Sequence, residues 1–200
     1  MVHLCLDFEG VLIPEIWQCL AKEVNSDDLM LTTQDLKDYD ELMSLRMKVV
    51  NEENIKLSDI QKIVRDIDPF DGAQEFLDWA RSKFQVTIVS DTFYELAWPL
   101  VEKLGYPSII CHNMTVENDK ITGYKLRQPN NKQKVIEALQ SLKFKVFASG
   151  DSYNDINMLN TADLGIFFQA PKHIKEEYPD LLTASSHNCL LYTSPSPRDP

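Results

Sequence analysis

The sequence predicts an α/β protein, in which a Rossmann-like parallel sheet carries helices on both faces and a small helical cap is inserted. Three observations predict it. Short apolar runs alternate with amphipathic helical segments, as in βαβ units. Three of the runs end in acidic or hydroxyl residues, and ligands of parallel sheets bind beyond the carboxyl ends of the strands. A length of 200 residues suits one domain, or a core with a small inserted subdomain.

Four apolar segments are predicted to be buried strands. They are VHLCL (2–6) before Asp7, QVTIV (85–89) before Ser90-Asp91-Thr92, KVFAS (145–149) before Gly150-Asp151-Ser152, and GIFF (165–168). Amphipathic patterns between them predict helices over DGAQEFLDWARSKF, FYELAWPLVEKLG and NKQKVIEALQSLK. Because parallel strands share one carboxyl edge, we expect the polar residues after the first three strands to converge.

Between the first two strands the pattern is helical throughout. The segments PEIWQCLAKEV, TQDLKDYDELMSLRMKVVNEE and KLSDIQKIVRDI contain no convincing strand. Residues 14–68 are therefore predicted to form the cap, and residues 1–13 and 69–188 the core. The aromatic and methionine stripe of the cap is predicted to be core rather than a binding face; it comprises Trp17, Tyr39, Met43 and Met47.

Two further segments have their own signals. Residues 109–111 and 121–124 flank Asn118-Asp119, a dipeptide that favours a hairpin turn. From Cys189 onward the chain reads CLLYTSPSPRDP, which has no periodicity. Residues 189–200 are predicted to be a disordered or non-native tail, and fold reasoning leaves them out.

The charge balance limits the partners. The net charge is −11, from 20 basic and 31 acidic side chains, so the chain repels a nucleic acid backbone at long range. A small phosphorylated substrate remains compatible if a metal ion neutralises the site. No apolar run approaches the roughly 20 residues of a membrane helix, and no signal peptide is evident. With four scattered cysteines, the sequence predicts a cytoplasmic protein with reduced thiols and leaves its oligomeric state open.

The pair Asp7 and Glu9 is the first candidate for chemistry. A carboxylate fixed at a strand end can attack phosphorus when the charge of the phosphoryl group is neutralised around it. Glu9 lies on the same side of an extended chain and can act as acid or base. Taken alone, the D-x-E pattern is weak evidence and is more typical of a solvated turn or a helix N-cap.

The segment GDSYND places Asp151 at a strand end and Asp155 one helical turn later. Asp7 and Asp151 together offer the hard oxygen ligands that Mg²⁺ prefers. The alternative is that Asp151 or Ser152 only caps the following helix. Two carboxylates in one crevice favour the metal, because they repel each other without a cation.

Two more candidates concern phosphate binding. Ser90-Asp91-Thr92 before a helix offers a hydroxyl and backbone N–H groups as a phosphate cradle, an assignment compatible with helix capping. Lys132 opens a helix and can balance phosphate charge, although a surface lysine is the alternative for it, as for Lys125 and Lys134. The four histidines show no metal-binding spacing and are assigned to the structure or the surface; they are His3, His112, His173 and His187.

Taken in order, D-x-E-G, S-D-T, a lysine at a helix start and G-D-S-Y-N-D resemble the motifs of the haloacid dehalogenase-like phosphatase superfamily. The resemblance covers residues 1 to about 185. The segments DFEGVLIPEIW, SDTFYE, GYKLRQ and GDSYND are similar to the phosphoserine phosphatase/homoserine phosphotransferase subgroup. That subgroup carries Glu at the second carboxylate, as here, where most of the superfamily has Asp.

The resemblance implies a role for each matching residue. Asp7 would be the nucleophile, Glu9 the general acid and base, and Mg²⁺ would be held by the side chains of Asp7 and Asp151 and the backbone carbonyl of Glu9. Lys132 matches the third-motif lysine, because Val135 and Ile136 follow it at the family's spacing. The remaining implied residues are Ser90, Asp91 and Thr92 for the phosphoryl group, Glu15 and Arg46 for the substrate's ammonium and carboxylate, and Asn154 and Asp155 behind the metal and the lysine.

The implied reaction is a Mg²⁺-dependent hydrolysis of phosphoserine through an aspartyl phosphate, with possible transfer of the phosphoryl group to homoserine. One alternative is a phosphatase of the same superfamily that acts on another small phosphomonoester. A second alternative, from a different class, is a non-catalytic phosphoacceptor or ligand-binding module. The order of the motifs and the cap count against the latter.

Overall fold

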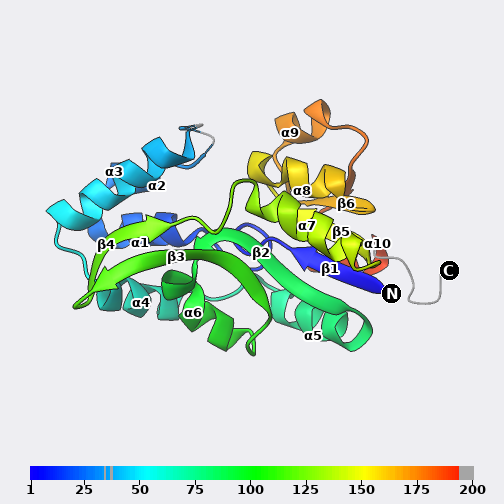
Figure 1. Cartoon of the computed structure of the whole chain (residues 1–200), viewed down its shortest axis with the longest axis horizontal. Helices are drawn as coiled ribbons and strands as arrows, with labels where there is room; N and C mark the ends of the chain where they lie inside the picture. Colours follow the sequence, from blue (N-terminus) through cyan, green and yellow to red (C-terminus); the bar gives the residue numbers. More distant parts are fainter. Residues whose placement is uncertain (34, 37, 194–200) are drawn as a thin grey trace.

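The computed structural model describes residues 1–33, 35–36 and 38–193. These residues form an α/β fold around a seven-stranded sheet of order β4-β3-β2-β1-β5-β6-β7 (Figure 1). All neighbouring strands are parallel except β3 and β4. The strands are β1 (Val2–Leu6), β2 (Gln85–Phe93), β3 (Ile109–Glu117), β4 (Lys120–Lys125), β5 (Lys145–Gly150), β6 (Leu164–Phe168) and β7 (Leu182–Ala184). The predicted fold class is confirmed.

Helices cover both faces of the sheet. One apolar cluster joins the sheet to α5 (Ala73–Lys83), α6 (Tyr94–Lys103) and α10 (His187–Thr193). The other joins it to α7 (Asn131–Ser141), α8 (Ile156–Thr161) and α9 (Lys172–Glu177). Residues of β1 alternate between the clusters, with Leu4 and Leu6 in the first and Cys5 in the second. This alternation is expected of a central strand buried on both sides.

Between β1 and α5 the described residues form helices and no strand of the sheet. These helices, called the helical insert below, are α1 (Ile16–Val24), α2 (Asp27–Met30), α3 (Tyr39–Glu52) and α4 (Leu57–Asp66). Helix α3 begins later than the sequence predicts, because the Asp38 side chain accepts hydrogen bonds from the N–H groups of Asp40 and Glu41 and caps the helix there. The insert lies beside β3 and β4 (Figure 1). Its division from the core at residues 14 and 68 stays a prediction.

The sheet order places the polar strand ends together. Strand β1 lies between β2 and β5, with Leu6 opposite Ile88 on one side and Ser149 on the other. The Asp7 N–H continues the ladder by donating to the Ser149 carbonyl at 2.9 Å. The residues that follow β1 and β5, and the end of β2, therefore meet at one edge of the sheet, as expected.

The strand end expected at Val89 is wrong. Helix α6 begins at Tyr94, after Ser90-Asp91-Thr92 as predicted, but β2 continues through these three residues to Phe93 after a register shift against β3. The N-cap of α6 is Phe93, and no side chain caps that helix. Ser90 and Thr92 thus reach the site as strand residues.

The other predictions of elements have mixed outcomes. The hairpin is confirmed and longer than predicted, with Asn118 and Asp119 at φ 50° and 68°, the positive values of a type I′ turn. Strand β7 and helices α9 and α10 were not predicted. Of the predicted tail, residues 189–193 lie in α10, and residues 194–200 lie outside the described residues. No helix of the described residues has the length and apolar character needed to span a membrane.

Candidate active site

Asp7 occupies the centre of the site and is almost fully buried. Its Oδ1 accepts a hydrogen bond from the Phe8 N–H at 2.7 Å, and its Oδ2 lies 2.8 Å from Lys132 Nζ. Burial, followed by the negative charge of Asp155, raises the pKa of Asp7 well above its ordinary value, while Lys132 lowers it. The carboxylate is therefore fixed at both oxygens, next to a cation, at the end of the central strand.

Lys132 joins the third motif to the first and the fourth. Its ammonium lies 2.7 Å from Asp155 Oδ1 and 2.8 Å from Asp7 Oδ2, and its side chain is only 4% exposed. Lys134 instead pairs with Glu137 on the surface, and Lys125 is exposed on β4. Of the three lysines that the sequence left open, the structure thus places Lys132 in the site.

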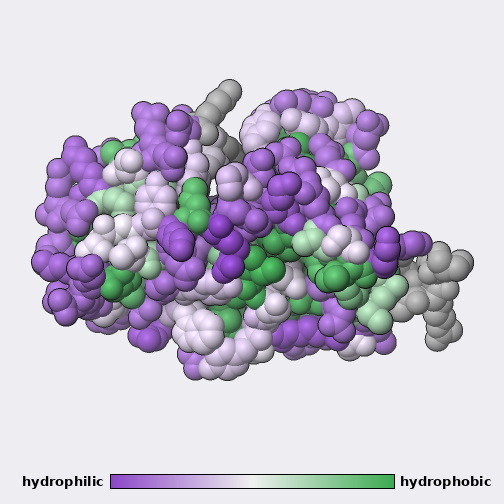
Figure 2. Space-filling view, in the orientation of Figure 1, coloured by the Kyte–Doolittle hydropathy of each residue, from purple (hydrophilic) through white to green (hydrophobic). Residues whose placement is uncertain are grey.

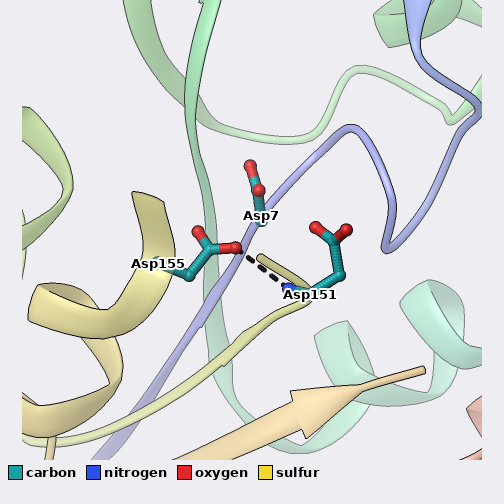
Figure 3. A group of neighbouring side chains, drawn as sticks. All are labelled: Asp7, Asp151 and Asp155. Atoms are coloured by element: carbon teal, nitrogen blue, oxygen red, sulfur yellow. Dashed lines mark hydrogen bonds between the residues drawn. The ribbon is translucent and has the colours of Figure 1, made fainter. Parts of the chain in front are cut away.

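Asp155 organises the loop that follows β5. Its Oδ2 accepts hydrogen bonds from the N–H groups of Asp151 and Ser152 at 2.9 and 3.2 Å, while Oδ1 binds Lys132. Figure 3 shows the carboxylates of Asp151 and Asp155, from the segment after β5, gathered near the carboxylate of Asp7, with the Asp155–Asp151 hydrogen bond drawn. Both oxygens of Asp155 are therefore engaged in holding the loop and the lysine.

Gly10 makes room for Asp151. A Cβ at Gly10 would lie 2.4 Å from the Asp151 Cγ, and the backbone there has φ +78°, which favours glycine. These two constraints explain why the D-x-E-G motif has a glycine at this position. Gly10 lets the loop after β1 turn and approach the carboxylate of Asp151 in the fourth motif.

Three carboxylates lie close enough together to surround a cation, although both oxygens of Asp155 already bind other groups. Asp7, Asp151 and Asp155 each offer an oxygen within 4.8 Å of the other two. Asp151 Oδ1 is buried with no hydrogen-bond partner among the described residues. Burial and the charges of Asp155 and Glu15 raise the pKa of Asp151 to about 8. An orphaned buried oxygen among like charges fits a hard divalent cation, which would relieve the repulsion.

Glu9 lines the same cavity as Asp7 and Asp151. Its Oε1 accepts a hydrogen bond from the Ile16 N–H at 2.7 Å, at the start of α1. Burial, with the charge of Glu15, raises the pKa of Glu9 to about 8, although Ile16 and Arg46 lower it. A carboxyl group protonated near neutral pH can serve as a general acid. The predicted role of its backbone carbonyl in metal binding stays a prediction.

Glu15 and Arg46 bring opposite charges to the cavity from the insert. The Arg46 guanidinium is buried, with Nη2 donating to the Leu31 carbonyl at 3.1 Å and Cζ 4.9 Å from the centre of the Trp17 ring. Its Nε is buried and unpartnered within the described part of the chain. Arg46 lowers the pKa of Glu15, which burial raises. The arginine is thus a buried residue that lines the cavity, not an exposed residue of α3.

The end of β2 completes the wall. Ser90 and Thr92 are buried, and Thr92 Oγ1 has no hydrogen-bond partner within the described chain. Asp91 lies between Lys132, His112 and Asn154, and these three lower its pKa to about 2 against the effect of burial. The Tyr39 hydroxyl donates to the Asp91 carbonyl at 3.0 Å and so joins α3 to β2.

These residues surround two adjoining cavities. The catalytic cavity, about 250 Å³, is lined by residues of all four motifs, although not by Asp155, together with Glu15 and Arg46. A larger outer cavity of about 950 Å³ shares Tyr39, Asp91, Lys132 and Asn154 with it. In Figure 2 the surface is indented between the lobe of α3 and the lobe of α8 and α9. The catalytic cavity therefore adjoins the larger outer cavity.

Sequence reasoning missed three residues of this site. Trp17 and Tyr39 were predicted to be core, and Trp17 is indeed buried, yet both line the catalytic cavity. His112, assigned to the structure, contacts Asp91. The signal that could have found Trp17 and Tyr39 is their place in helices next to Glu15 and Arg46. No local signal marks His112.

Comparison with known proteins supports a single family. The haloacid dehalogenase-like hydrolase family matches residues 12–160. Phosphoserine phosphatase ThrH of Pseudomonas aeruginosa is 47% identical over 93% of this chain and 91% of its own length. A phosphoserine phosphatase of Pseudomonas syringae is 47% identical over 88% of this chain and 74% of its own.

Solved structures show the same fold. A phosphoserine phosphatase in apo form superposes with a TM-score of 0.78 at 21% identity, over 96% of this chain and 98% of that one. A phospho-aspartyl intermediate analogue of phosphoserine phosphatase gives 0.76 at 20% identity, with the same coverage. At these identities the likeness concerns the fold alone.

Proposed function

The chain belongs to the haloacid dehalogenase-like hydrolase family, and we propose that it is a Mg²⁺-dependent phosphoserine phosphatase that forms an aspartyl phosphate on Asp7. One observation carries the choice of substrate. Glu15 and Arg46 lie in the same cavity as Asp7 and Glu9, so one cavity offers opposite charges for an amino acid and a nucleophile for its phosphate. The names of the relatives at 47% identity support the same substrate.

In the first half-reaction an oxygen of the Asp7 carboxylate attacks phosphorus. The new bond joins Asp7 to the phosphoryl group while the bond from phosphorus to the serine oxygen breaks, and its electron pair stays on that oxygen. Glu9, protonated because its pKa is about 8, donates the proton that makes serine a neutral leaving group. Ser90 and Lys132 donate hydrogen bonds to the phosphoryl oxygens.

In the second half-reaction Glu9, now a carboxylate, removes a proton from water. The water oxygen bonds to phosphorus, the bond to Asp7 breaks, and Asp7 regains its charge as phosphate leaves. Mg²⁺ bound by Asp7 and Asp151, with Asp155 behind them, would neutralise charge on the phosphoryl group. If the hydroxyl of homoserine replaces water, the same steps make O-phosphohomoserine.

The test is incubation with phosphoserine and Mg²⁺, with and without homoserine, while free phosphate and O-phosphohomoserine are followed together. We expect phosphate release that EDTA abolishes and that Asp7→Asn lowers by at least ~10³-fold. Asp7→Asn with full turnover would refute the mechanism. The predicted cytoplasmic location stays a prediction.

A second candidate is another small phosphomonoester, and the outer cavity favours it because a larger leaving group has room there. Arg46→Ala separates the two. For phosphoserine we expect KM to rise by ~10–100-fold, since a charge-assisted contact to the carboxylate is lost. A preferred substrate without an amino acid group would leave its KM unchanged in this variant.

A further inference from the structure

The Lys132 ammonium has three N–H donors, and the resting structure occupies two of them. Asp7 Oδ2 and Asp155 Oδ1 lie 2.8 and 2.7 Å from Nζ, which are charge-assisted hydrogen-bond distances. A third carboxylate oxygen, Asp91 Oδ2, lies 3.7 Å away, beyond hydrogen-bond distance. The third donor is therefore close to a carboxylate that does not bind it.

Asp91 is a strong competitor for that donor. Lys132, His112 and Asn154 hold the pKa of Asp91 at about 2, so the carboxylate stays charged at neutral pH. An anion at 3.7 Å would gain a charge-assisted hydrogen bond by moving less than about 1 Å toward the ammonium. Other groups therefore have to hold the Asp91 carboxylate at this distance.

Two donors contact the Asp91 carboxylate besides Lys132. His112 Nε2 lies 3.4 Å from Oδ1, and Asn154 Nδ2 donates to Oδ2 at 3.2 Å. The tautomer of His112 follows from its second contact, because Nδ1 accepts a hydrogen bond from the Arg127 N–H at 3.1 Å. A ring whose Nδ1 accepts carries its proton on Nε2, facing Asp91. His112 is 3% exposed and packs beside the Phe93 ring, so its position is fixed.

We propose that His112 is a positioning residue that holds the Asp91 carboxylate away from Lys132, so that Lys132 keeps one N–H for a phosphoryl oxygen. The inference rests on the proposed function, in which Lys132 binds the transferring group. It goes beyond the motif residues, since His112 lies on β3, outside all four motifs, and does not line the catalytic cavity.

The test compares two substitutions, each of which retains one of the two hydrogen-bonding functions of the His112 ring. His112→Gln retains an N–H donor at about the distance of Nε2. His112→Asn retains an acceptor for the Arg127 N–H but does not reach Asp91. Calorimetric binding of inorganic phosphate in the presence of Mg²⁺ measures the free donor directly. We expect phosphate affinity to fall about tenfold in His112→Asn, as for one lost hydrogen bond, and less than threefold in His112→Gln.

Asp91→Asn supplies the decisive background, because a neutral amide no longer competes for the ammonium. We expect His112→Asn to cost nothing in phosphate affinity once Asp91→Asn is present. A purely structural role predicts the same tenfold loss in both backgrounds. Circular dichroism and thermal melting check that each variant is folded. If His112→Asn does not fold, the exposed Asn154→Ala releases the other oxygen of Asp91 and should show the same loss and the same suppression.

Three results would overturn the inference: unchanged phosphate affinity in His112→Asn, an equal loss in His112→Gln, or a loss that persists with Asp91→Asn. Wild-type protein that binds no phosphate with Mg²⁺ would overturn it as well. Failure of the proposed function has a different signature. In that case the wild type would not turn over phosphoserine, while Asp91→Asn would still remove the loss of phosphate affinity caused by His112→Asn.

Discussion

At the scale of single residues, Glu9 and Asp7 lie in one cavity, but their carboxyl groups have different neighbours. Asp7 faces the Lys132 ammonium at 2.8 Å, whereas the nearest donor to Glu9 is the uncharged Ile16 N–H. A cation favours the charged form of a carboxyl group more than an amide does. Burial raises the pKa of both carboxyl groups, but Lys132 contacts Asp7 directly and opposes that rise, which supports the proposed roles of Asp7 as nucleophile and Glu9 as proton donor.

This assignment predicts a pH dependence. Since the pKa of Glu9 is about 8, the acid is present below that pH and is lost above it. We expect the single-turnover rate of phosphoserine cleavage to fall as pH rises through about 8. Glu9→Gln should lower the rate by ~10²–10⁴-fold and remove this limb of the profile. A good leaving group such as p-nitrophenolate needs no proton, so Glu9→Gln should lower the rate of p-nitrophenyl phosphate cleavage much less. An equal loss of rate with both substrates would contradict the role of Glu9 as general acid.

Gly10 provides a second prediction at this scale. Alanine there would place Cβ 2.4 Å from the Asp151 carboxyl carbon, in a backbone conformation with φ +78°. We expect Gly10→Ala to displace Asp151 and raise the Mg²⁺ concentration for half-maximal activity by ~10-fold or more. Gly123→Ala is the matched control, because its Cβ would meet no atom within 4 Å. Equal Mg²⁺ dependence in the two variants would rule the explanation out.

The sequence was sufficient for the residues that its motifs carry. Asp7, Glu9 and Asp151 follow apolar runs, so their place at strand ends is visible from local pattern alone. Tyr39 and His112 act through contacts with Asp91, which lies 52 and 21 positions away along the chain. Neither contact leaves a periodic or compositional trace, because each depends on how a helix or strand packs against β2.

At the scale of elements, the hairpin β3–β4 is joined to the helical insert at its turn. Asp119 receives the Ser58 N–H at 3.0 Å and the Ser58 hydroxyl at 2.6 Å, and its carbonyl accepts from the Leu57 N–H at 2.9 Å. A distant residue thus satisfies the free N–H groups at the start of α4.

Removing this cap should loosen the insert. We expect Asp119→Ala to lower the melting temperature by about 2–4 °C, through the loss of the capping bonds to α4. Glu117→Ala, also exposed on the hairpin, serves as the control and should leave the melting temperature unchanged. Hydrogen exchange should show faster opening at the start of α4. Unchanged exchange there would show that the turn does not hold the helix.

The errors in the predicted elements have physical reasons. Strand β7 has three residues, two of them exposed, which is too short for an alternating pattern to stand out. Strand β2 continues through Ser90-Asp91-Thr92, whose polarity suggested a strand end before a helix. Ser90 and Thr92 are buried, Asp91 is partly exposed, and all three line the catalytic cavity, so a functional requirement overrides the usual polarity of a strand end.

At the scale of the whole molecule, the order of the strands decides which motifs meet. The sequence predicted that polar strand ends converge but did not give their order. With β1 between β2 and β5, the ends of these three strands are neighbours, while β6 lies one strand further from the centre. The long connections through the insert and through α5 make this order possible, and local pattern does not encode it.

The gathered carboxylates make the stability of the molecule depend on pH and metal. The pKa values of Glu9 and Asp151 are both about 8 in the folded chain, well above the ordinary values of 4.5 and 3.8. Protons on these groups therefore stabilise the fold. That contribution is fully present below about pH 4 and is lost as pH rises to about 8.

Mg²⁺ should replace the lost protons, because a cation bound only by the folded state raises stability by about 2.7 kcal/mol at one hundred times its Kd. In EDTA we expect the melting temperature to fall between pH 5.5 and 8. Saturating Mg²⁺ should raise it by several degrees at pH 8 and by much less at pH 5.5, where protons compete for Asp151. Asp151→Asn removes one carboxylate, so it should raise the melting temperature in EDTA at pH 8 and abolish the Mg²⁺ shift. Equal Mg²⁺ shifts at the two pH values, or a shift that survives in Asp151→Asn, would show that these carboxylates do not bind the cation.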